Sequence, residues 1–354
     1  MTKKKYYADI LKDIRQNKGK HKELKTDDKI LIVDGLNTFI RCFSVIPTLN
    51  DNGIHIGGLS GFLKSIGYAI RTLNPTRCIV VFDGKGGSQR RRKLYPNYKS
   101  NRKPNLRYNR VEDIANAQDE QQSMLMQLKR TVEYLEEMPI TTMAMDKVEA
   151  DDVIAYISQQ IYNESEIHIM STDKDFLQLV DDRVHVWNPT KRMSYNPTRV
   201  MEEYNMPSHN FTIFRALDGD KSDNIRGIPG IGLKTLQKRL PMLFEDKKVE
   251  LDDLIKYAKE HQDDAKVLKN IAFGEDTLYL NYVLMQLHEV DISGNTKMNI
   301  MRTVREEIPT LVKYKIHKMV VEDKLWSAIP NVDNWLQNFV TLNKYADLKK
   351  EKNG

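Results

Sequence analysis

The fold is decided by Val148-Glu149-Ala150-Asp151-Asp152-Val153 and by the similar stretch Ser171-Thr172-Asp173-Lys174-Asp175. Between them, residues 167–170 form a short apolar run that is typical of a buried strand, and the second stretch follows it directly. Two other apolar runs, 30–33 and 79–82, are each followed by an aspartate and a glycine. Because the carboxyl ends of parallel strands meet at one edge of an open sheet, these acids predict a site at that edge.

The first acidic stretch also has a simpler explanation. Glu149 and Asp152 stand three residues apart at the start of a helix that we expect to run to about residue 161, so they share one face of it. Acidic residues in a first turn complement the helix dipole, and this stretch alone could be an ordinary helix start. The repetition of acids after several apolar runs argues against that explanation.

Short apolar segments alternate with helical patterns up to about residue 198. This alternation predicts a doubly wound, mainly parallel α/β sheet. From Arg199 onward the strand signals fade and the sequence is mainly helical in pattern. His185 alternates with apolar neighbours in a strand expected at 184–187, so we expect a structural histidine rather than a metal ligand.

Composition indicates a soluble protein of ordinary hydrophobicity. The chain has 354 residues, a formal net charge of +6 and 40% hydrophobic residues, a length that suits about two domains. No apolar run approaches the ~20 residues needed to cross a bilayer. Cys42 and Cys78 lie beside apolar segments and are expected to be buried free thiols, so we expect a cytoplasmic protein.

A strongly basic segment follows the second expected strand. From Lys85 through Arg110 the chain carries ten Lys and Arg residues and no acidic one, with tyrosines interleaved. A charge run is usually a solvated face, but ten unbalanced cations repel one another unless an anion binds, and arginine favours phosphate. Aromatic rings can also stack on bases. We therefore expect residues 85–112 to form a basic arch that binds nucleic acid. The candidate contacts are Arg90, Arg91, Lys93, Tyr98, Lys99, Arg102 and Lys103.

A second basic element lies at residues 219–240. Gly-Ile-Pro-Gly-Ile-Gly at 227–232 could be any tight turn, but it opens a helix with several cations. Backbone N–H groups at the helix start and these cations can face one phosphate. We expect a helix–hairpin–helix that binds duplex backbone without reading its sequence. Its candidate contacts are Gly230, Gly232, Lys234 and Lys238.

Nine acidic residues would converge at the predicted site. They are Asp34, Asp83, Glu149, Asp151, Asp152, Asp173, Asp175, Asp220 and Asp223. So many charges cannot all stay ionised without counter-ions. No His/Cys cluster has zinc-ligand spacing, and all-oxygen ligation selects Mg²⁺ or Mn²⁺. Two such ions about 4 Å apart would activate a water and stabilise the leaving oxygen of a phosphodiester, so the pattern predicts hydrolysis of a nucleic-acid strand.

From about residue 29 to 240 the chain resembles the structure-specific 5′-nucleases: flap endonucleases, the 5′-nuclease domain of bacterial repair polymerases, and phage 5′–3′ exonucleases. The resemblance implies a PIN-like core in which the nine acids bind two Mg²⁺ ions, with Mn²⁺ able to substitute. Asp152 and Asp173 would be among the catalytic residues. The segment 98–102 matches the Tyr-Lys-x-x-Arg motif of the family's helical arch. Lys99 and Arg102 would therefore contact the scissile phosphate, and Tyr98 would stack on a base.

Two further segments, 184–189 and 274–281, look most like the phage RNase H branch of this family. That branch removes RNA primers during phage DNA replication, alongside a sliding clamp and a single-strand-binding protein. The resemblance also implies a K⁺ ion at the hairpin, a monomer, and a location in the host cytoplasm. The length leaves no room for a polymerase domain, so we expect a stand-alone nuclease.

The expected domains are a basic N-terminal extension (1–28), a catalytic α/β domain that contains the arch (29–198) and a helical DNA-binding domain (199–354). The predicted activity is that of a Mg²⁺-dependent 5′–3′ exonuclease and flap endonuclease, with RNase H-type activity on RNA–DNA duplexes. Its substrates would be branched or nicked duplexes with a free 5′ end. Two alternatives stay open: a non-catalytic protein that binds branched DNA, and a single-strand ribonuclease of the PIN class.

Overall fold

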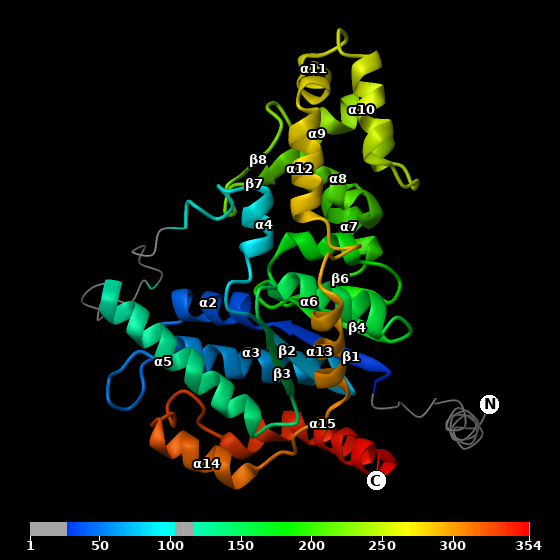
Figure 1. The fold of residues 1–354 in the computed structure, drawn as a ribbon. Helices are drawn as coiled ribbons and strands as arrows, with labels where there is room; N and C mark the ends of the chain where they lie inside the picture. Colours follow the sequence, from blue (N-terminus) through cyan, green and yellow to red (C-terminus); the bar gives the residue numbers. More distant parts are fainter. Residues whose placement is uncertain (1–26, 103–108, 110–116, 354) are drawn as a thin grey trace, which may run out of the picture.

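One six-stranded sheet forms the centre of the computed structural model, which describes residues 27–102, 109 and 117–353 (Figure 1). The strand order is β3-β2-β1-β4-β5-β6, and every neighbouring pair is parallel except β5 and β6. The strands are β1 (Lys29–Asp34), β2 (Arg77–Asp83), β3 (Thr141–Met145), β4 (Glu166–Met170), β5 (Val184–Asn188) and β6 (Met193–Tyr195). The doubly wound, mainly parallel sheet predicted from the sequence is confirmed.

The central strands are apolar because both faces of the sheet are covered. In β1, Ile30 and Ile32 belong to one hydrophobic core, and Leu31 and Val33 belong to the other. The direction in which strands are added reverses between β1 and β4. In open α/β sheets, this reversal opens a crevice at the carboxyl ends of the two strands.

Helices from distant parts of the chain cover the two faces. The face that carries Leu31 packs against α2 (Gly35–Val45), α3 (Gly57–Leu73), α5 (Ala117–Glu136), α14 (Lys313–Glu322) and α15 (Val332–Asn353). The opposite face packs against α6 (Ala150–Tyr156), which continues as a π-helical turn (Ile157–Ile161), and against α13 (Gly294–Arg305).

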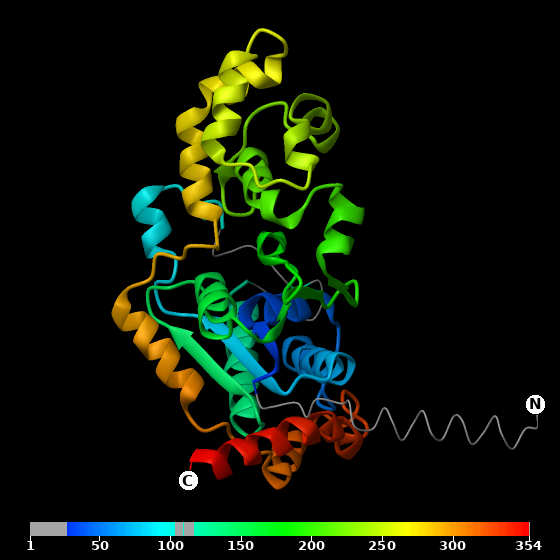
Figure 2. The ribbon, with the colours of Figure 1, turned by 90° about the vertical axis from the view of Figure 1, so that its right-hand side faces the viewer.

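A group of helices stands above the carboxyl ends of the strands (Figures 1 and 2). It contains α7 (Pro197–Tyr204), α8 (Phe211–Asp218), α9 (Leu233–Arg239), α10 (Leu251–Glu260), α11 (Lys266–Phe273) and α12 (Glu275–Met285). Helix α12 packs on α8 and also touches α4 (Gln89–Leu94), the short helix of the basic segment. The edge of the sheet that carries the acids therefore faces this helical group.

The expected division at residue 198 needs correction, because the C-terminal helices return to the sheet. Leu336 and Phe339 of α15 lie in the same core as Leu31 and Phe62, and Figure 1 shows α14 and α15 at the end of the molecule opposite α10 and α11. These apolar side chains are buried on the sheet rather than on the DNA-binding helices. The expected N-terminal extension lies outside the described residues, apart from 27 and 28.

Close approach of the chain explains one glycine at the edge of the sheet. A Cβ at Gly84, directly after β2, would lie 1.8 Å from the carbonyl oxygen of Met145 at the end of β3. The glycine thus lets the two strand ends meet beside Asp83. Cys42 and Cys78 are buried free thiols, as expected. Within the described part of the chain, no helix has the length and hydropathy to cross a membrane.

Candidate active site

The acids that end β1 and β2 are fixed by hydrogen bonds to neighbouring elements. Asp34 caps α2 by accepting the Asn37 N–H at 3.2 Å, and it accepts the Ser171 hydroxyl at 3.0 Å. Asp83 accepts the Ala150 N–H at 2.9 Å, at the start of α6. These bonds connect the end of β1 to the segment after β4, and the end of β2 to the start of α6.

Five of the predicted acids line a common cavity of about 500 Å³: Asp34, Asp83, Asp151, Asp173 and Asp223. Asp34 and Asp83 end β1 and β2, Asp151 lies in α6, Asp173 follows β4, and Asp223 lies in the segment after α8. Burial raises the pKa of Asp34 to about 7, although hydrogen bonds from Asn37 and Ser171 oppose this, and the charges of Asp83 and Asp173 raise it further. The fold thus brings these carboxylates together, and they repel one another.

Asp151 and Asp173 show the same crowding. Burial raises the pKa of Asp151 well above its ordinary value, and the charges of Asp34 and Asp173 add to the effect. Burial also raises the pKa of Asp173, even though its carboxylate accepts the Asp175 N–H at 2.8 Å. A divalent cation in the cavity would relieve this repulsion.

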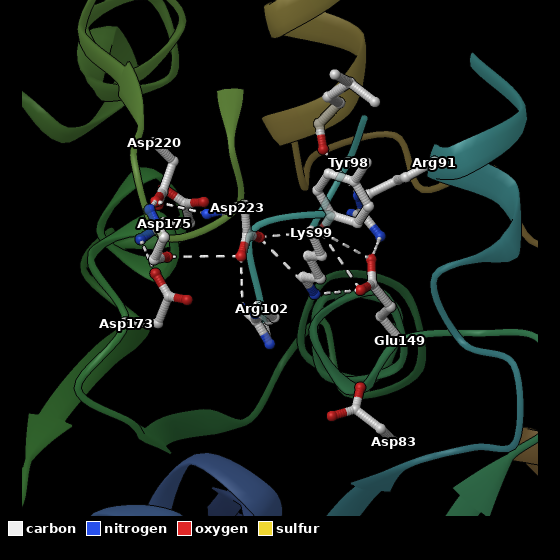
Figure 3. Close-up of polar contacts among 12 residues, drawn as sticks. Asp83, Arg91, Tyr98, Lys99, Arg102, Glu149, Asp173, Asp175, Asp220 and Asp223 are labelled. Carbon is white, nitrogen blue, oxygen red and sulfur yellow. Dashed lines mark hydrogen bonds and ion pairs between the residues drawn. The ribbon is translucent and has the colours of Figure 1, made fainter. Parts of the chain in front are cut away.

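A buried arginine organises a second group of acids. Arg215 of α8 donates from Nε to Asp175 at 2.5 Å and from Nη2 to Asp220 at 2.7 Å. Asp220 lies in β7 (Gly219–Asp220), a two-residue strand paired with β8 (Ile225–Arg226). Burial and the charge of Asp173 raise the pKa of Asp175 to about 7, despite Arg215. Figure 3 shows Asp173, Asp175 and Asp220 on one side of the site.

The basic segment closes the opposite side of the site (Figure 3). Arg91 of α4 donates to both oxygens of Asp152, at 2.8 and 2.9 Å, and also to Glu149. Its Nε donates at 2.8 Å to the carbonyl of Leu284 in α12. Burial alone would raise the pKa of Glu149, but the charges of Arg91 and Lys99 outweigh burial and hold it below its ordinary value. Arg91 thus joins the arch, the acidic helix and the helical group.

Three residues of the Tyr-Lys-x-x-Arg motif contact acids. Lys99 pairs with Glu149 and lies 3.7 Å from Asp223. Arg102 pairs with Asp223 at 2.5 Å, and the Tyr98 hydroxyl donates to Asp223 at 3.0 Å. The predicted acids and the predicted phosphate ligands are therefore neighbours, and they neutralise one another in this conformation.

Two of the expected nucleic-acid contacts are buried in this conformation. Arg91 is only 4% exposed, because it is enclosed by the acids that it binds. Tyr98 is 3% exposed and packs with Ile225, Leu284 and Met285. Neither side chain presents a surface to a phosphate or a base here, so both are structural parts of the site in this conformation.

The other predicted contacts of the arch differ in exposure. Arg90 is partly buried and lies 3.5 Å from Asp152 and 3.7 Å from Asp291. Lys93 is exposed. Lys103 lies outside the described residues.

The predicted hairpin is held between α8 and α11. Gly230 has a φ of +87°, and its position is open to solvent, as is that of Gly232 at the start of α9. The Asn270 side chain of α11 donates to the Pro229 carbonyl at 2.9 Å. Lys234 and Lys238 of α9 are exposed, so these four residues form a solvent-facing surface that can reach a phosphate backbone.

Sequence reasoning missed two arginines of the site. Arg215 stands alone among apolar residues in Phe211–Asp218 and lies five residues before Asp220, a signal that could have marked it as a buried partner of acids. Arg41 of α2 lines the same cavity as Asp34 and Asp173. It follows Asp34 by seven residues, two helical turns, so it lies on the face of α2 that begins at the site.

The donor set fits a hard divalent cation. Asp34, Asp83, Asp151 and Asp173 offer only carboxylate oxygens, the ligands that Mg²⁺ and Mn²⁺ prefer. Asp175, Asp220 and Asp223 offer the same donors across the site. The assignment of individual acids as ligands, Glu149 and Asp152 included, stays a prediction.

Comparison with protein-family models identifies residues 29–205 as a 5′–3′ exonuclease N-terminal, resolvase-like domain. The chain belongs to the 5′–3′ exonuclease family. It is a nuclease of the 5′–3′ exonuclease type, as the sequence predicted. The 5′–3′ exonuclease of Buchnera aphidicola from Schizaphis graminum is 32% identical over 211 residues, which is 58% of this chain and 67% of that protein. DNA polymerase I of Thermus aquaticus is 32% identical over 214 residues, 60% of this chain and only 24% of the polymerase.

Solved structures share the fold. The flap endonuclease of bacteriophage T5, in a complex with DNA and metal ions, has a TM-score of 0.58 at 24% identity and covers 83% of this chain and 98% of its own. Human GEN1, in a complex with Holliday junction DNA, has a TM-score of 0.54 at 13% identity and covers 94% of this chain and 77% of its own. The PIN-like 5′-nuclease fold is therefore confirmed.

Proposed function

We propose that this nuclease is a Mg²⁺-dependent enzyme that cuts 5′ flaps and 5′ ends of branched or nicked duplexes, leaving a 5′-phosphate and a 3′-hydroxyl. One observation carries the proposal: Asp34, Asp83, Asp151 and Asp173 line a cavity that Lys99 and Arg102 also line. Acids that attract divalent cations and cations that attract phosphate thus border the same space. Phosphodiester hydrolysis requires both.

The carboxylates divide into two groups that could each hold one ion. Asp34, Asp83 and Asp151 lie toward β1, β2 and α6, and Asp175, Asp220 and Asp223 lie toward α8 and β7, with Asp173 between the groups. Two bound Mg²⁺ ions, for which Mn²⁺ could substitute, would supply an activated water and stabilise the leaving 3′-oxygen. Figure 3 shows Asp83 on the side of the site away from Asp175 and Asp220.

Lys99 and Arg102 would bind the scissile phosphate. In this conformation their charges are taken up by Glu149 and Asp223. When these acids bind other cations instead, the two basic side chains become free to bind a phosphate at the rim of the same cavity. They would orient the phosphate and stabilise the charge that develops on it.

The exposed hairpin and α9 would hold the duplex next to the cut. Gly230, Gly232, Lys234 and Lys238 face solvent, and contacts from backbone N–H groups and lysines to phosphates carry no base specificity. A K⁺ ion at the hairpin is part of this proposal. The T5 protein, which shares the fold, is a flap endonuclease. As part of the same proposal, this chain removes RNA primers and flaps in phage DNA replication, with a sliding clamp and a single-strand-binding protein as partners.

A panel of doubly labelled substrates tests this function. We expect Mg²⁺-dependent cleavage near the junction of a 5′-flapped duplex, and cleavage of nicked duplexes, with little cutting of blunt duplex or of 3′ flaps. Comparing cleavage of DNA flaps with cleavage of RNA flaps measures the preference for RNA that a primer-removing enzyme needs. Tight binding without cleavage would favour the non-catalytic alternative, and a preference for single-stranded RNA over every branched duplex would favour a PIN-type ribonuclease.

A further inference from the structure

Two histidines and a glutamate meet at the start of β4 and β5, the edge of the sheet opposite the acidic cavity. In the parallel register of these strands, His168 lies beside His185. Glu166 precedes His168 by two residues, so both side chains lie on the same face of β4. The expected structural histidine, His185, therefore has a second imidazole as its neighbour.

The three side chains have the spacing of metal ligands. One donor atom from each lies within 4.8 Å of the donors of the other two. The two imidazole rings are 5.3 Å apart between centroids, and His168 Nε2 lies 2.8 Å from Glu166 Oε1. Two adjacent strands hold these ligands, so their backbone separation is already fixed before any ion binds.

His168 is prepared for an ion in two ways. Its side chain is buried, and its Nδ1 has no hydrogen-bond partner among the residues that the structure describes. A buried ring nitrogen that has no other partner can bind a metal ion.

We propose that Glu166, His168 and His185 form a second metal site that binds Zn²⁺ or Co²⁺ and leaves a position open for water. Two imidazole nitrogens and one carboxylate suit borderline metals, whereas Mg²⁺ prefers oxygen ligands. The Glu166 side chain is 44% exposed, so an ion can reach the site from solvent. The site is separate from the acidic cavity and would cross-link β4 and β5.

One neighbouring cation competes for the site. Lys29 Nζ lies 3.0 Å from Glu166 Oε1, the same oxygen that contacts His168. A bound ion must displace this lysine or share the carboxylate with it. Removing the charge of Lys29 should therefore strengthen metal binding, an effect that the proposal predicts and that a purely structural hydrogen-bond network does not.

Metal titration of the full chain tests the proposal. With excess Mg²⁺ present to occupy oxygen sites, we expect one equivalent of Co²⁺ to give a visible absorption band that Zn²⁺ abolishes. His185→Gln and Glu166→Gln should each weaken Zn²⁺ binding at least roughly tenfold, Lys29→Met should strengthen it, and Asp173→Asn should leave it unchanged. His317→Gln is the matched control, because His317 pairs with Asp333 at 3.0 Å and so is also a histidine beside a carboxylate.

The binding results of the variants decide whether the site exists. Loss of the Co²⁺ band in His185→Gln but not in His317→Gln supports the site. If His185→Gln binds Zn²⁺ as the unmodified chain does, or if Asp173→Asn removes the binding, the histidine pair is not a metal site. Circular dichroism of each variant without metal shows whether the fold is intact, and the conservative Gln substitutions keep a polar side chain at each position.

Discussion

Arg91 donates two parallel hydrogen bonds to Asp152, from Nη1 to Oδ2 at 2.8 Å and from Nη2 to Oδ1 at 2.9 Å. Both side chains are almost fully buried, and Glu149 shares the same guanidinium. The basic segment, which looks like a nucleic-acid arm in sequence, thus supplies the counter-charge of the acidic helix. This arrangement makes the position of α6 depend on α4.

Removal of Arg91 should destabilise the fold. Arg91→Ala leaves Glu149 and Asp152 buried without their partner, so the free energy of unfolding should fall by about 3–5 kcal/mol. Arg91→Lys keeps the charge but loses the two-pronged geometry, and its effect should be smaller. Urea unfolding in EDTA measures both. Arg92→Ala, an exposed neighbour on α4, should change stability by no more than about 0.5 kcal/mol. Equal effects at Arg91 and Arg92 would contradict a buried role for Arg91.

Stability without metal should depend on pH through Asp34. Its pKa of about 7 in the folded chain lies above its ordinary value of 3.8, so the folded state holds a proton that the unfolded state has released. This contribution to stability is therefore present at low pH and disappears as the pH rises from about 4 to about 7. Asp34→Asn removes the titration and keeps the helix cap.

Thermal unfolding in EDTA measures this effect. We expect Asp34→Asn to be more stable than the unmodified chain at pH 7.5, with a smaller difference at pH 5. Excess Mg²⁺ should reverse the order, because only the carboxylate gains from the cation. The exposed Asp263→Asn is the control. A variant at Asp34 with unchanged stability at both pH values would show that the acids of the cavity do not strain the fold.

Substitution of Lys99 should affect turnover more than binding. Lys99 lines the acidic cavity, so Lys99→Ala should lower the single-turnover rate by roughly a hundredfold or more, as expected for removal of a group that stabilises developing charge. Dissociation constants for flapped DNA should change only a few-fold. Lys93→Ala, on the exposed side of α4, should leave the rate nearly unchanged. If Lys99→Ala changes only salt-sensitive DNA binding and not the cleavage rate, Lys99 does not take part in the chemical step.

Substitution of the hairpin lysines should weaken duplex binding without changing the rate of cutting. Lys234→Ala with Lys238→Ala should reduce the slope of log binding constant against log salt concentration by about 0.9 for each phosphate that the lysines no longer neutralise. The control is Lys64→Ala, an exposed lysine on α3. Fluorescence anisotropy over a range of salt concentrations measures the slope. An unchanged slope would show that the duplex does not contact these two lysines.

The sequence predicted the sheet and its acidic edge because both are local features. Apolar runs that end in Asp34 and Asp83 are readable from the order of residues alone, and the parallel strands then bring their ends together. The partners of those acids were not predictable in the same way. Arg215 meets Asp175 across 40 residues, and Arg91 meets Asp152 across 61. Only the packing of α4 and α8 decides these pairs.

The burial of Arg91 and Tyr98 could not be predicted from the sequence. Arginine and tyrosine are residue types that often contact nucleic acid. Whether Arg91 and Tyr98 can reach a ligand depends on their burial, which the residue type alone does not reveal. The pair His168 and His185 was overlooked because parallel strand register, not sequence spacing, makes them neighbours. Helices α14 and α15 were placed with the wrong domain because their apolar faces do not reveal which core they cover.

Cleavage of a 5′-flapped duplex by the unmodified chain and by Asp173→Asn, at equal DNA occupancy, tests the central claim most directly. Asp173 lies between the two groups of acids, so we predict Mg²⁺-dependent cutting near the junction by the unmodified chain, no cutting in EDTA, and flap binding without measurable cutting by the variant. Cleavage by Asp173→Asn at an unchanged rate would contradict catalysis by metal ions held at this edge of the sheet.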